Sequence, residues 1–321
     1  MSRQIEVSVI LVNYNCEDMI LHSIQSLQET TTDINYEIIV VDNSSNAKFA
    51  EKLRKIPKVI YLDSMENIGF GRANNLGAAE AKGKYLYILG SDTIVCTNVL
   101  KQFCQIMQLL ENKEKIGVLG STILDSNKKD VTCIGPFVNP NKFMLSKLLF
   151  FGKKILGLDG RNWGFLRLNP KQKNCSVNHL LEVEGYLIGC SLFMAKNVFL
   201  KLDGFDDRFF MYSEDLDLQY RMKKLGLKSY LVKDAEIIHF SGGSFDEPKS
   251  NKRRIMRNIS AIRYYHKNHG LLAANLLRMT MISIGILDTL VDLFKREYSF
   301  QDNISHICAL SLDNYFVRSD K

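Results

Sequence analysis

Short runs of β-branched and apolar residues alternate with helix-like stretches over the first third of the chain. Strands are predicted at 7–14, 36–45, 59–63 and 84–92, with a helix at 16–30 between the first two. Strands that are separated by crossover helices form parallel sheets covered by helices on both faces. The alternation therefore predicts an α/β fold with a doubly wound, mostly parallel sheet.

Polar residues follow the predicted strands. Asn13 and Asn15 follow the first strand, Asp42 the second and Asp92 the fourth. Open parallel sheets bind ligands beyond the carboxyl ends of their strands, so we expect these side chains along one rim. Each of them alone is also explained by ordinary turn chemistry. No Gly-x-Gly-x-x-Gly turn follows the first strand, so the standard dinucleotide fingerprint is missing.

A Gly- and Asn-rich segment at 66–83, ENIGFGRANNLGAAEAKG, opens a helix that leads into the fourth strand. Backbone amides at a helix start can bind phosphate oxygens, and Arg72 could add a charged contact to a nucleotide. A plain loop and helix entry is the alternative.

The segment 213–226 is the best specified helix, because Ser213 stands at its N-cap, acidic residues fill its first turn and Gly226 follows its last turn. An acid at the head of its buried face points toward the crevice of the sheet. The alternative is that Glu214 and Asp215 only complement the helix dipole. The predicted buried face consists of Asp215, Leu218, Met222 and Leu225.

Aromatic residues precede this acid pair at Phe209, Phe210 and Tyr212. Apolar surroundings raise the proton affinity of a carboxylate, as a general base requires. Asp92 could bind a divalent cation together with diphosphate oxygens, since Mg²⁺ and Mn²⁺ need few protein ligands there. His239, at the end of the last predicted strand, could be a second metal ligand or a structural residue.

The rest of the chain is less regular. Residues 126–180 are predicted to be a loop-rich insertion, within which 144–158 form either an amphipathic helix for an acceptor or membrane surface or a core helix. Residues 182–240 form a second composite unit, and the chain is helical beyond about residue 255. The apolar stretch 270–294 carries three charged residues, so a transmembrane helix is not expected; the alternatives are peripheral membrane attachment and packing on the catalytic domain.

The chain has a formal charge of +7, which suits anionic substrates or an anionic membrane surface. Its seven Cys residues form no CxxC pair, and their odd number argues against a complete disulfide framework, which favours a cytoplasmic location. The N-terminal run is too short for a secretory signal. Basic residues gather late in the chain, and they form either a solvated face or a contact with a membrane or a diphosphate. They are Lys249, Lys252, Arg253, Arg254, Arg257, Arg263 and Lys267.

Taken in order, six motifs resemble the family 2 glycosyltransferases of GT-A fold, in particular their rhamnosyltransferase-like branch. They cover about residues 5–245 and read VSVILVNYN, IIVVDNSS, ENIGFGRANNLG, LYILGSDT, EGYLIGCSLFMAKNVFLKLDGFDDRFFMYSEDLDLQYRMKKLG and IIHFSGGS. The corresponding expectation is a GT-A catalytic domain at 1–254, with a nucleotide-binding half to about 125 and an acceptor half after it. Residues 255–321 would be a helical C-terminal extension.

The resemblance implies an inverting transfer of one sugar from a nucleotide diphosphate donor, with dTDP-rhamnose or a UDP-sugar favoured, and with Mg²⁺ or Mn²⁺ as cofactor. The acceptor would be a hydroxyl of a cell-surface glycan, such as a lipopolysaccharide unit on a lipid, at the inner face of the plasma membrane. No nucleic-acid partner is implied. Two alternatives stay open, namely an inactive carbohydrate- or nucleotide-binding scaffold and a sugar nucleotidyltransferase.

The resemblance also implies roles for single residues. Asp215 of the Glu214–Asp215 pair resembles the catalytic base, and Asp92 and His239 resemble metal or diphosphate ligands. Gly90 stands where the family's metal motif has its first acid, which is the one feature that favours an inactive protein. The expected nucleotide pocket, with Asp42 at the pyrimidine base, consists of Asn13, Asn15, Asp42, Asn67, Gly69, Arg72, Asn75 and Ser91.

Overall fold

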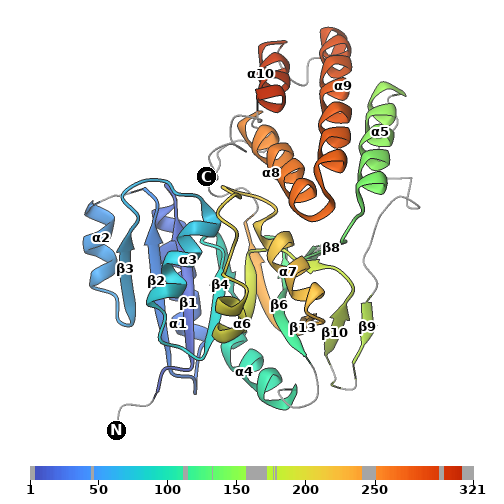
Figure 1. Ribbon diagram of the computed structural model, residues 1–321. Coiled ribbons are helices and arrows are strands. Elements are labelled where there is room, and N and C mark those ends of the chain that lie inside the picture. The colour runs from blue at the N-terminus through green and yellow to red at the C-terminus, as the bar shows by residue number, and fades with distance from the viewer. Residues whose placement is uncertain are drawn as a thin grey trace. The chain divides into compact units, whose positions relative to one another are not determined.

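The computed structural model contains a parallel four-stranded half that follows the predicted alternation of strands and helices (Figure 1). Its strands lie in the order β3-β2-β1-β4 and every pair among them is parallel. Their bounds are β1 Val7–Asn13, β2 Tyr36–Asp42, β3 Val59–Asp63 and β4 Tyr85–Leu89. The structure describes residues 4–44, 47–110, 115–131, 133–156, 172–175, 177, 179–240, 251–295 and 300–312.

All four predicted strands are confirmed, although three end earlier than expected. Strand β1 ends at Asn13, β2 at Asp42 and β4 at Leu89, because the residues that follow leave the ladder as turns. Every residue of β1, β2 and β4 is buried. Helices on both faces of the sheet explain why these runs are mostly apolar and do not alternate regularly with polar residues.

Four helices accompany these strands, α1 Glu17–Thr30, α2 Ala47–Arg54, α3 Phe70–Glu80 and α4 Val99–Leu110. The chain moves in one direction from β1 to β3 and then returns past β1 to β4. Because parallel crossovers are right-handed, this reversal places α3 on the face opposite α1 (Figure 1). The reversal is a topological switch point, where such sheets open a crevice beyond their strand ends.

The second half of the sheet is mixed. Strand β12 (Ser191–Ala195) lies antiparallel between β4 and β6 (Ile116–Leu124). Strand β13 (Lys228–His239) runs parallel to β6 and antiparallel to the short β5 (Thr93–Val95). The central sheet as a whole is therefore mixed and mostly parallel, as predicted. Its remaining strands and helices are β7 Asp130–Val131, β9 Gln172–Asn174, β10 Leu180–Val183, α6 Lys196–Lys201 and α7 Glu214–Lys224, beside a small ribbon of β8 Ile134–Gly135 and β11 Tyr186–Leu187.

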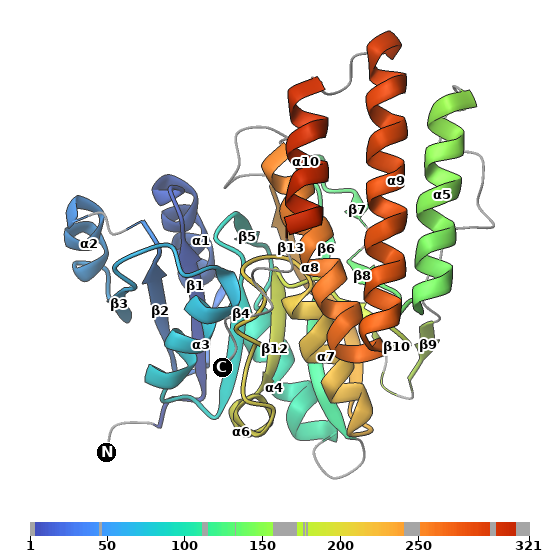
Figure 2. The same cartoon turned by 45° about the horizontal axis from the view of Figure 1, so that its top comes forward.

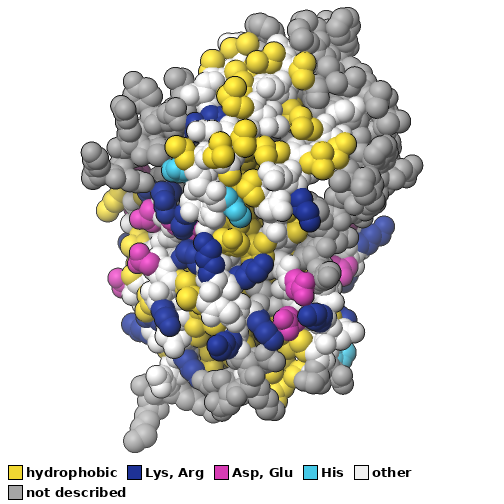
Figure 3. All heavy atoms as spheres, turned by 45° about the vertical axis from the view of Figure 1, so that its right-hand side comes forward, with side chains coloured by type: hydrophobic (Ala, Val, Ile, Leu, Met, Phe, Trp, Pro, Cys, Tyr) yellow, Lys and Arg dark blue, Asp and Glu magenta, His cyan; other side chains and the backbone are white. Residues whose placement is uncertain are grey.

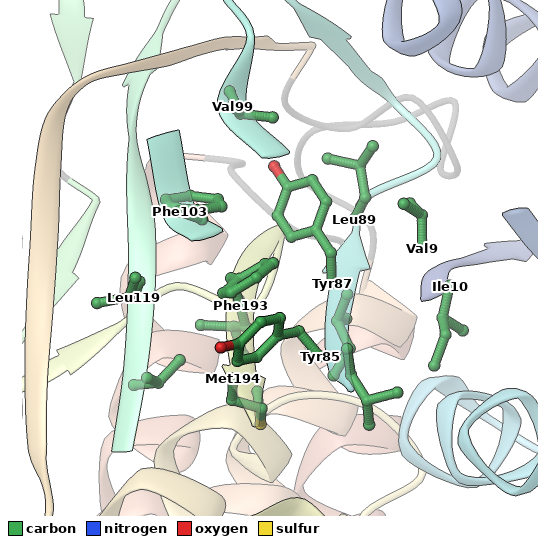
Figure 4. Packing of buried hydrophobic residues seen from close by; sticks show 14 of the residues in the cluster. Val9, Ile10, Tyr85, Tyr87, Leu89, Val99, Phe103, Leu119, Phe193 and Met194 are labelled. Atoms are coloured by element: carbon green, nitrogen blue, oxygen red, sulfur yellow. The ribbon is translucent and has the colours of Figure 1, made fainter. Parts of the chain in front are cut away.

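Aromatic side chains fix the antiparallel strand β12 in the core (Figure 4). The ring of Phe193 lies 5.2 Å from that of Tyr85 and 5.0 Å from that of Phe103 on α4, centroid to centroid. The hydroxyl groups of Tyr87 and Ser191 are 3.0 Å apart and form a hydrogen bond inside the core. This packing joins β4, β12 and α4, and so holds the strand ends from which the site is built.

The described helices α5 Pro140–Leu156, α8 Asn251–His269, α9 Leu271–Lys295 and α10 Phe300–Leu312 belong to a second compact unit. Helix α9 contacts each of the other three (Figure 2). Arg254 of α8 donates to Asn303 of α10 at 2.9 Å, and Tyr265 donates to the Val138 carbonyl at 2.9 Å. The helical character expected beyond residue 255 is confirmed for the described residues. The domain boundary expected after residue 254 stays a prediction. Helix α5 lies before that boundary, in the predicted catalytic domain, but it belongs to the same compact unit as the C-terminal helices.

In the described part of the chain, no helix has both the length and the apolar character that crossing a membrane requires. The seven cysteines are all free thiols.

Candidate active site

The acid pair Glu214 and Asp215 begins helix α7 in the α/β unit. Leu218 and Met222 of the predicted inner face are buried, as expected. Leu225 was expected there too, but it is 49% exposed because the helix ends at Lys224. Glu214 is buried and Asp215 only partly buried. The pair therefore lies where α7 meets the sheet, with Glu214 the deeper residue.

Backbone N–H groups hold the Asp215 carboxylate. Gly189 donates to Oδ2 at 2.9 Å and Leu216 donates to Oδ1 at 2.8 Å. Burial raises the pKa of Asp215, while these hydrogen bonds oppose the rise. A carboxylate with raised proton affinity that stays ionisable suits a general base.

An aromatic ring from another part of the chain lies near this carboxylate. Burial, and then the charges of Asp215 and Glu214, raise the pKa of the Tyr186 hydroxyl. The sequence had placed the aromatic surroundings at Phe209 and Phe210, of which Phe209 is buried and Phe210 is 40% exposed. No local signal pointed to Tyr186, which is 28 residues before Glu214 along the chain.

Glu214 is the more deeply buried acid of the pair. Its Oε2 atom is buried, and no described residue of the structure forms a hydrogen bond with it. Burial, and then the charge of Asp215, raise its pKa to about 8. Burial and mutual repulsion therefore disfavour a state in which both acids of the pair are ionised.

Asp92 and His239, the two predicted metal ligands, meet at the end of the sheet. The pairing of β13 with β5 sets His239 opposite Thr93. The Asp92 Oδ1 and His239 Nε2 atoms are 3.2 Å apart, and both side chains are largely buried. The FSGGS run that follows His239 lies, from Ser241 onward, outside the described residues.

One carboxylate and one imidazole fit a divalent cation only if other donors complete its shell. Across the described residues, no group of three or more His, Cys, Asp or Glu side chains is arranged to hold a metal. Mg²⁺ and Mn²⁺ commonly take one or two protein ligands plus water and substrate phosphate oxygens. The Asp92–His239 pair fits that pattern, with a diphosphate as the missing partner.

Gly90 replaces the first acid of the metal motif, and the packing around it accounts for the glycine. A Cβ atom at this position would lie 3.2 Å from Asp92 Oδ1, from Cys190 Cβ and from Thr93 Cγ2. The backbone N–H of Gly90 donates to the Cys190 carbonyl at 2.9 Å. The glycine thus allows the turn that carries Asp92 to lie against Cys190.

Residues Gly189 and Cys190 connect the two groups of acids. Gly189 binds Asp215, and Cys190 binds Gly90, which begins the turn that carries Asp92. The expected base and the expected diphosphate ligand therefore flank one dipeptide, although they are 123 residues apart in the sequence. This dipeptide was not among the predicted site residues.

Asn13 and Asp42 meet at the carboxyl ends of β1 and β2. Asn13 Nδ2 donates to Asp42 Oδ1 at 2.9 Å and both residues are fully buried. The Tyr61 hydroxyl donates to Asp42 Oδ2 at 3.0 Å, and burial together with this hydrogen bond raises the pKa of Tyr61. Ser44 Oγ accepts from the Asn15 N–H at 2.7 Å. The sequence did not predict the roles of Ser44, which stands in the DNSS motif, or of Tyr61.

The remaining predicted nucleotide residues form three further contacts. Asn67 Oδ1 accepts from the Gly69 N–H at 3.1 Å and lies 3.4 Å from Asn43 Nδ2. Cys16 Sγ contacts Ser91 Oγ at 3.3 Å and Asn13 Oδ1 at 3.3 Å, so Ser91 joins the same rim as Asn13. The predicted rim is thus assembled at the carboxyl edge of the sheet.

Arg72 and Asn75 on α3 point to a loop that was not expected to contact them. Arg72 donates through Nε and Nη2 to the Asp207 carbonyl, at 3.1 and 2.8 Å. Asn75 donates to the Phe205 carbonyl at 2.7 Å and accepts from the Phe205 N–H at 2.9 Å. Both side chains are thus bonded to the chain segment that precedes Glu214.

Comparison with known proteins identifies the family of this chain. The family model described as glycosyl transferase family 2 matches residues 8–167. The N-acetylglucosaminyl-diphospho-decaprenol L-rhamnosyltransferase of Mycobacterium tuberculosis is 42% identical over 250 residues, 74% of this chain and 76% of that protein.

Two further relatives match less of their own length. The glycosyltransferase RP339 of Rickettsia prowazekii is 28% identical over 67% of this chain and 58% of that protein. The UDP-Glc:alpha-D-GlcNAc-diphosphoundecaprenol beta-1,3-glucosyltransferase WfgD of Escherichia coli is 30% identical over 44% of this chain and 54% of that protein. The chain thus spans little more than half the length of either relative.

Solved structures share the fold. GalNAc-T7, solved with UDP, GalNAc and Mn²⁺, superposes with a TM-score of 0.56 at 15% identity, over 83% of this chain and 48% of that one. The mannosyltransferase PcManGT of Pyrobaculum calidifontis, solved with GDP-Man and Mn²⁺, superposes with a TM-score of 0.52 at 13% identity, over 99% of this chain and 89% of that one. With its GT-A fold and its match to the mycobacterial enzyme, this chain belongs to the family 2 glycosyltransferases, in their rhamnosyltransferase-like branch.

Proposed function

We propose that this protein is an inverting, metal-dependent glycosyltransferase that moves one sugar from a nucleotide diphosphate donor to a hydroxyl of a lipid-linked glycan. The observation that carries the proposal is the Gly189–Cys190 dipeptide, which binds Asp215 through the Gly189 N–H and binds Gly90, two residues before Asp92, through the Cys190 carbonyl. A base for the acceptor and a ligand for the donor diphosphate are needed within one sugar's reach of each other. This arrangement supplies both.

In the proposed reaction, Asp215 accepts the proton of the acceptor hydroxyl while that oxygen attacks the anomeric carbon of the donor sugar. The bond from that carbon to the diphosphate oxygen breaks as the new glycosidic bond forms, so the configuration inverts. The Gly189 N–H holds the carboxylate in position for the acceptor. The raised pKa of Glu214 disfavours a second negative charge beside the base.

A divalent cation, Mg²⁺ or Mn²⁺, would be held by Asp92 and His239 and would neutralise the charge of the departing nucleoside diphosphate. The structural neighbours contain Mn²⁺, which supports this choice. The chain itself binds the rest of the donor. Asp42 and Asn13 lie under the predicted base site, and Asn15, Asn67, Gly69 and Ser91 are assigned to the nucleotide around them.

The relatives suggest the substrates. One is named for rhamnosyl transfer and another for glucosyl transfer, each to an N-acetylglucosamine joined through diphosphate to a polyprenol. We assign dTDP-rhamnose as the preferred donor, with UDP-glucose as the second choice, and an N-acetylglucosaminyl diphospholipid as the acceptor. A lipid-linked acceptor requires the enzyme to work at a membrane surface, and the proposed location is the inner face of the plasma membrane.

The charge of the helical unit supports such a location. Helices α5, α8, α9 and α10 contain twelve Lys and Arg residues and three Asp residues, a net charge of +9. The whole chain carries +7, so the remainder is slightly acidic. Arg254 of the predicted basic cluster bonds within the unit, and Lys249 lies outside the described residues. Anionic lipid attracts a basic unit of this kind.

An exposed apolar stripe runs along α9 in the same unit. Leu272 is 75% exposed, Leu276 48% and Met279 61%, at the spacing of one helix face, and Ile286 continues that face. Figure 3 shows hydrophobic side chains gathered on one face of the helical unit. An apolar stripe on a basic helical unit is typical of proteins that lie in the membrane interface.

The test combines binding with turnover. Purified protein is titrated with dTDP, UDP and GDP in the presence and absence of Mn²⁺ by calorimetry. It is then incubated with dTDP-rhamnose or UDP-glucose and a short-chain N-acetylglucosaminyl diphospholipid, and the product is identified by mass spectrometry. We expect Mn²⁺-dependent pyrimidine nucleotide binding and one new glycosidic product. Nucleotide binding without any transfer or donor hydrolysis would favour the inactive binding protein, and release of pyrophosphate from a nucleoside triphosphate and a sugar phosphate would favour a nucleotidyltransferase.

A further inference from the structure

The loop of residues 202–210 is fastened to helix α3 by side chains that the sequence assigned to the nucleotide. Asn75 forms two short hydrogen bonds with the backbone of Phe205 and lies 3.4 Å from the Asp207 carboxylate. Arg72 donates twice to the Asp207 carbonyl. The backbone N–H of Phe70 donates to the Phe210 carbonyl at 2.9 Å. Helix α3 therefore holds the middle and the C-terminal end of this loop.

The loop accepts these contacts because of one glycine. Gly204 has φ of +62°, and a Cβ atom there would collide with Asn75 Oδ1. Phe205, the next residue, is buried. Its Cβ atom and that of Glu214 both face Gly71 of α3, where an added Cβ would lie 3.1 and 3.7 Å from them. The α3 surface that binds the loop thus also contacts the first residue of the acid pair.

Helix α7 binds the same loop from the other side. Arg221 donates to the carbonyl groups of Leu202 and Gly204, the latter at 2.7 Å, and forms an ion pair of 2.8 Å with Asp217. The loop is therefore the physical link between α3 and the helix that carries Glu214 and Asp215. Hydrogen bonds from these two helices thus restrain the backbone of the loop at Leu202, Gly204 and Phe205.

We infer that Asn75 and Arg72 are positioning residues for the acid pair, which they locate through the 202–210 loop, and that they do not serve as nucleotide ligands. The inference rests on the proposed function, since it assigns Asp215 the base role. Asn75 uses both of its side-chain polar atoms on the loop backbone, and Arg72 uses Nε and Nη2. A displacement of about 1 Å at a base can lower turnover about 100-fold. A loop anchor of this kind therefore affects turnover and leaves donor affinity unchanged.

Gly204→Ala is the sharpest variant, because it displaces the Asn75 side chain without removing any polar group. Gly226→Ala is its matched control. Gly226 has a similar φ of +72°, and no described atom lies within 4 Å of the added Cβ. Both substitutions carry the same backbone strain, on the order of 1 kcal/mol. Only the first one disturbs the loop contact.

Four variants are compared with wild type, namely Gly204→Ala, Gly226→Ala, Arg72→Met and Arg72→Lys. The Kd of dTDP or UDP with Mn²⁺ is measured by calorimetry, and kcat is measured with saturating donor and the short-chain diphospholipid. For Gly204→Ala and Arg72→Met we expect kcat to fall roughly 10- to 100-fold with Kd within about twofold of wild type. Arg72→Lys keeps one donor for the Asp207 carbonyl and should recover part of kcat. Gly226→Ala should match wild type.

A raised nucleotide Kd with unchanged kcat in Arg72→Met would make Arg72 a nucleotide ligand and overturn the inference. Unchanged kcat in Gly204→Ala would overturn it as well. A wild type that binds nucleotide but transfers nothing would instead count against the proposed function. In that case the melting temperature is measured between pH 5 and 8. The raised pKa of Glu214 should make the melting temperature of the wild type fall over this range. In Gly204→Ala, displacement of Phe205 from Gly71 should expose Glu214, so the melting temperature should fall less. An equal fall in Gly204→Ala and wild type would then refute the loop anchor itself.

Discussion

The backbone N–H of Gly189 donates a 2.9 Å hydrogen bond to the Oδ2 atom of Asp215. Gly189 follows β11 and Asp215 begins α7, so the bond ties a loop between strands to the acidic end of a helix. Gln219, one turn further along α7, holds the same loop through the N–H and carbonyl groups of Leu187, at 2.8 and 2.7 Å. The orientation of the candidate base is therefore set by backbone hydrogen bonds, which substitution of neighbouring side chains would leave in place.

Asp215→Asn should abolish transfer, because an amide cannot accept the acceptor proton. We expect kcat to fall by at least about 10³-fold, while the Kd of the nucleotide stays within about twofold. The control is Asp234→Asn, which removes an acid from an exposed ion pair with His179. The measurement is product formation by mass spectrometry together with calorimetric nucleotide binding. Full activity in Asp215→Asn would remove Asp215 from the mechanism.

Glu214→Gln should make stability less dependent on pH. The pKa of Glu214 rises from 4.5 in the unfolded chain to about 8 in the folded one, so the folded state binds the extra proton between these values. The free energy of unfolding of the wild type should then fall as pH rises from 4.5 to 8, by up to about 1.4 kcal/mol per pH unit. Thermal melts at several pH values should show a shallower slope in Glu214→Gln. Equal slopes in both proteins would show that Glu214 is ionised in the folded state at neutral pH.

Removal of divalent cations should stop transfer. EDTA should abolish turnover and Mn²⁺ should restore it, and His239→Gln should raise the Mn²⁺ concentration for half-maximal activity at least about tenfold. His179→Gln is the matched control, because His179 and Asp234 form a pair of similar length, 3.0 Å against 3.2 Å, on the exposed surface. Transfer that persists in EDTA would contradict the metal dependence.

The apolar stripe of α9 should bind anionic lipid. Leu272→Ser combined with Met279→Ser should weaken sedimentation with phosphatidylglycerol vesicles roughly tenfold or more, since buried Leu and Met side chains contribute about 1.5–3 kcal/mol each. Leu109→Ser is the control, because Leu109 lies on α4 of the α/β unit and is 47% exposed. Binding should also decrease as salt rises, because it depends on the basic helices. Equal sedimentation of all three proteins would contradict the assignment of α9 to the membrane.

Gly77→Ala tests the packing that sets the nucleotide rim. A Cβ atom at this position on α3 would lie 2.7 Å from Ile10 Cγ2 and 3.3 Å from Val41 Cγ2, so α3 must move away from β1. We expect a loss of about 1–3 kcal/mol in the free energy of unfolding, measured by urea denaturation. Gly152→Ala in helix α5 is the control, since no described atom lies within 4 Å of its added Cβ, and a small gain in stability is expected there. Two substitutions with equal effects would contradict the close packing at Gly77.

The sequence alone determined the local elements and the identity of several paired residues. The apolar runs fixed the positions of β1 to β4, and the acidic first turn and Gly226 fixed helix α7, because strand burial and helix ends depend on neighbours within a few residues. The common edge of parallel strand ends also predicted that Asn13 and Asp42 would lie on one rim, and the two residues are in fact bonded.

Contacts between distant parts of the chain required the tertiary structure. No local pattern shows that β12 inserts antiparallel beside β4, and that insertion carries Gly189 to Asp215 and Cys190 to Gly90. Asn75 binds Phe205, which is 130 residues further along the chain. The sequence gives no sign of this contact and therefore assigns the Asn75 side chain to the nucleotide. Periodicity and capping act within a few turns of chain, whereas these contacts depend on sheet order and strand register, which the packing of the whole core decides.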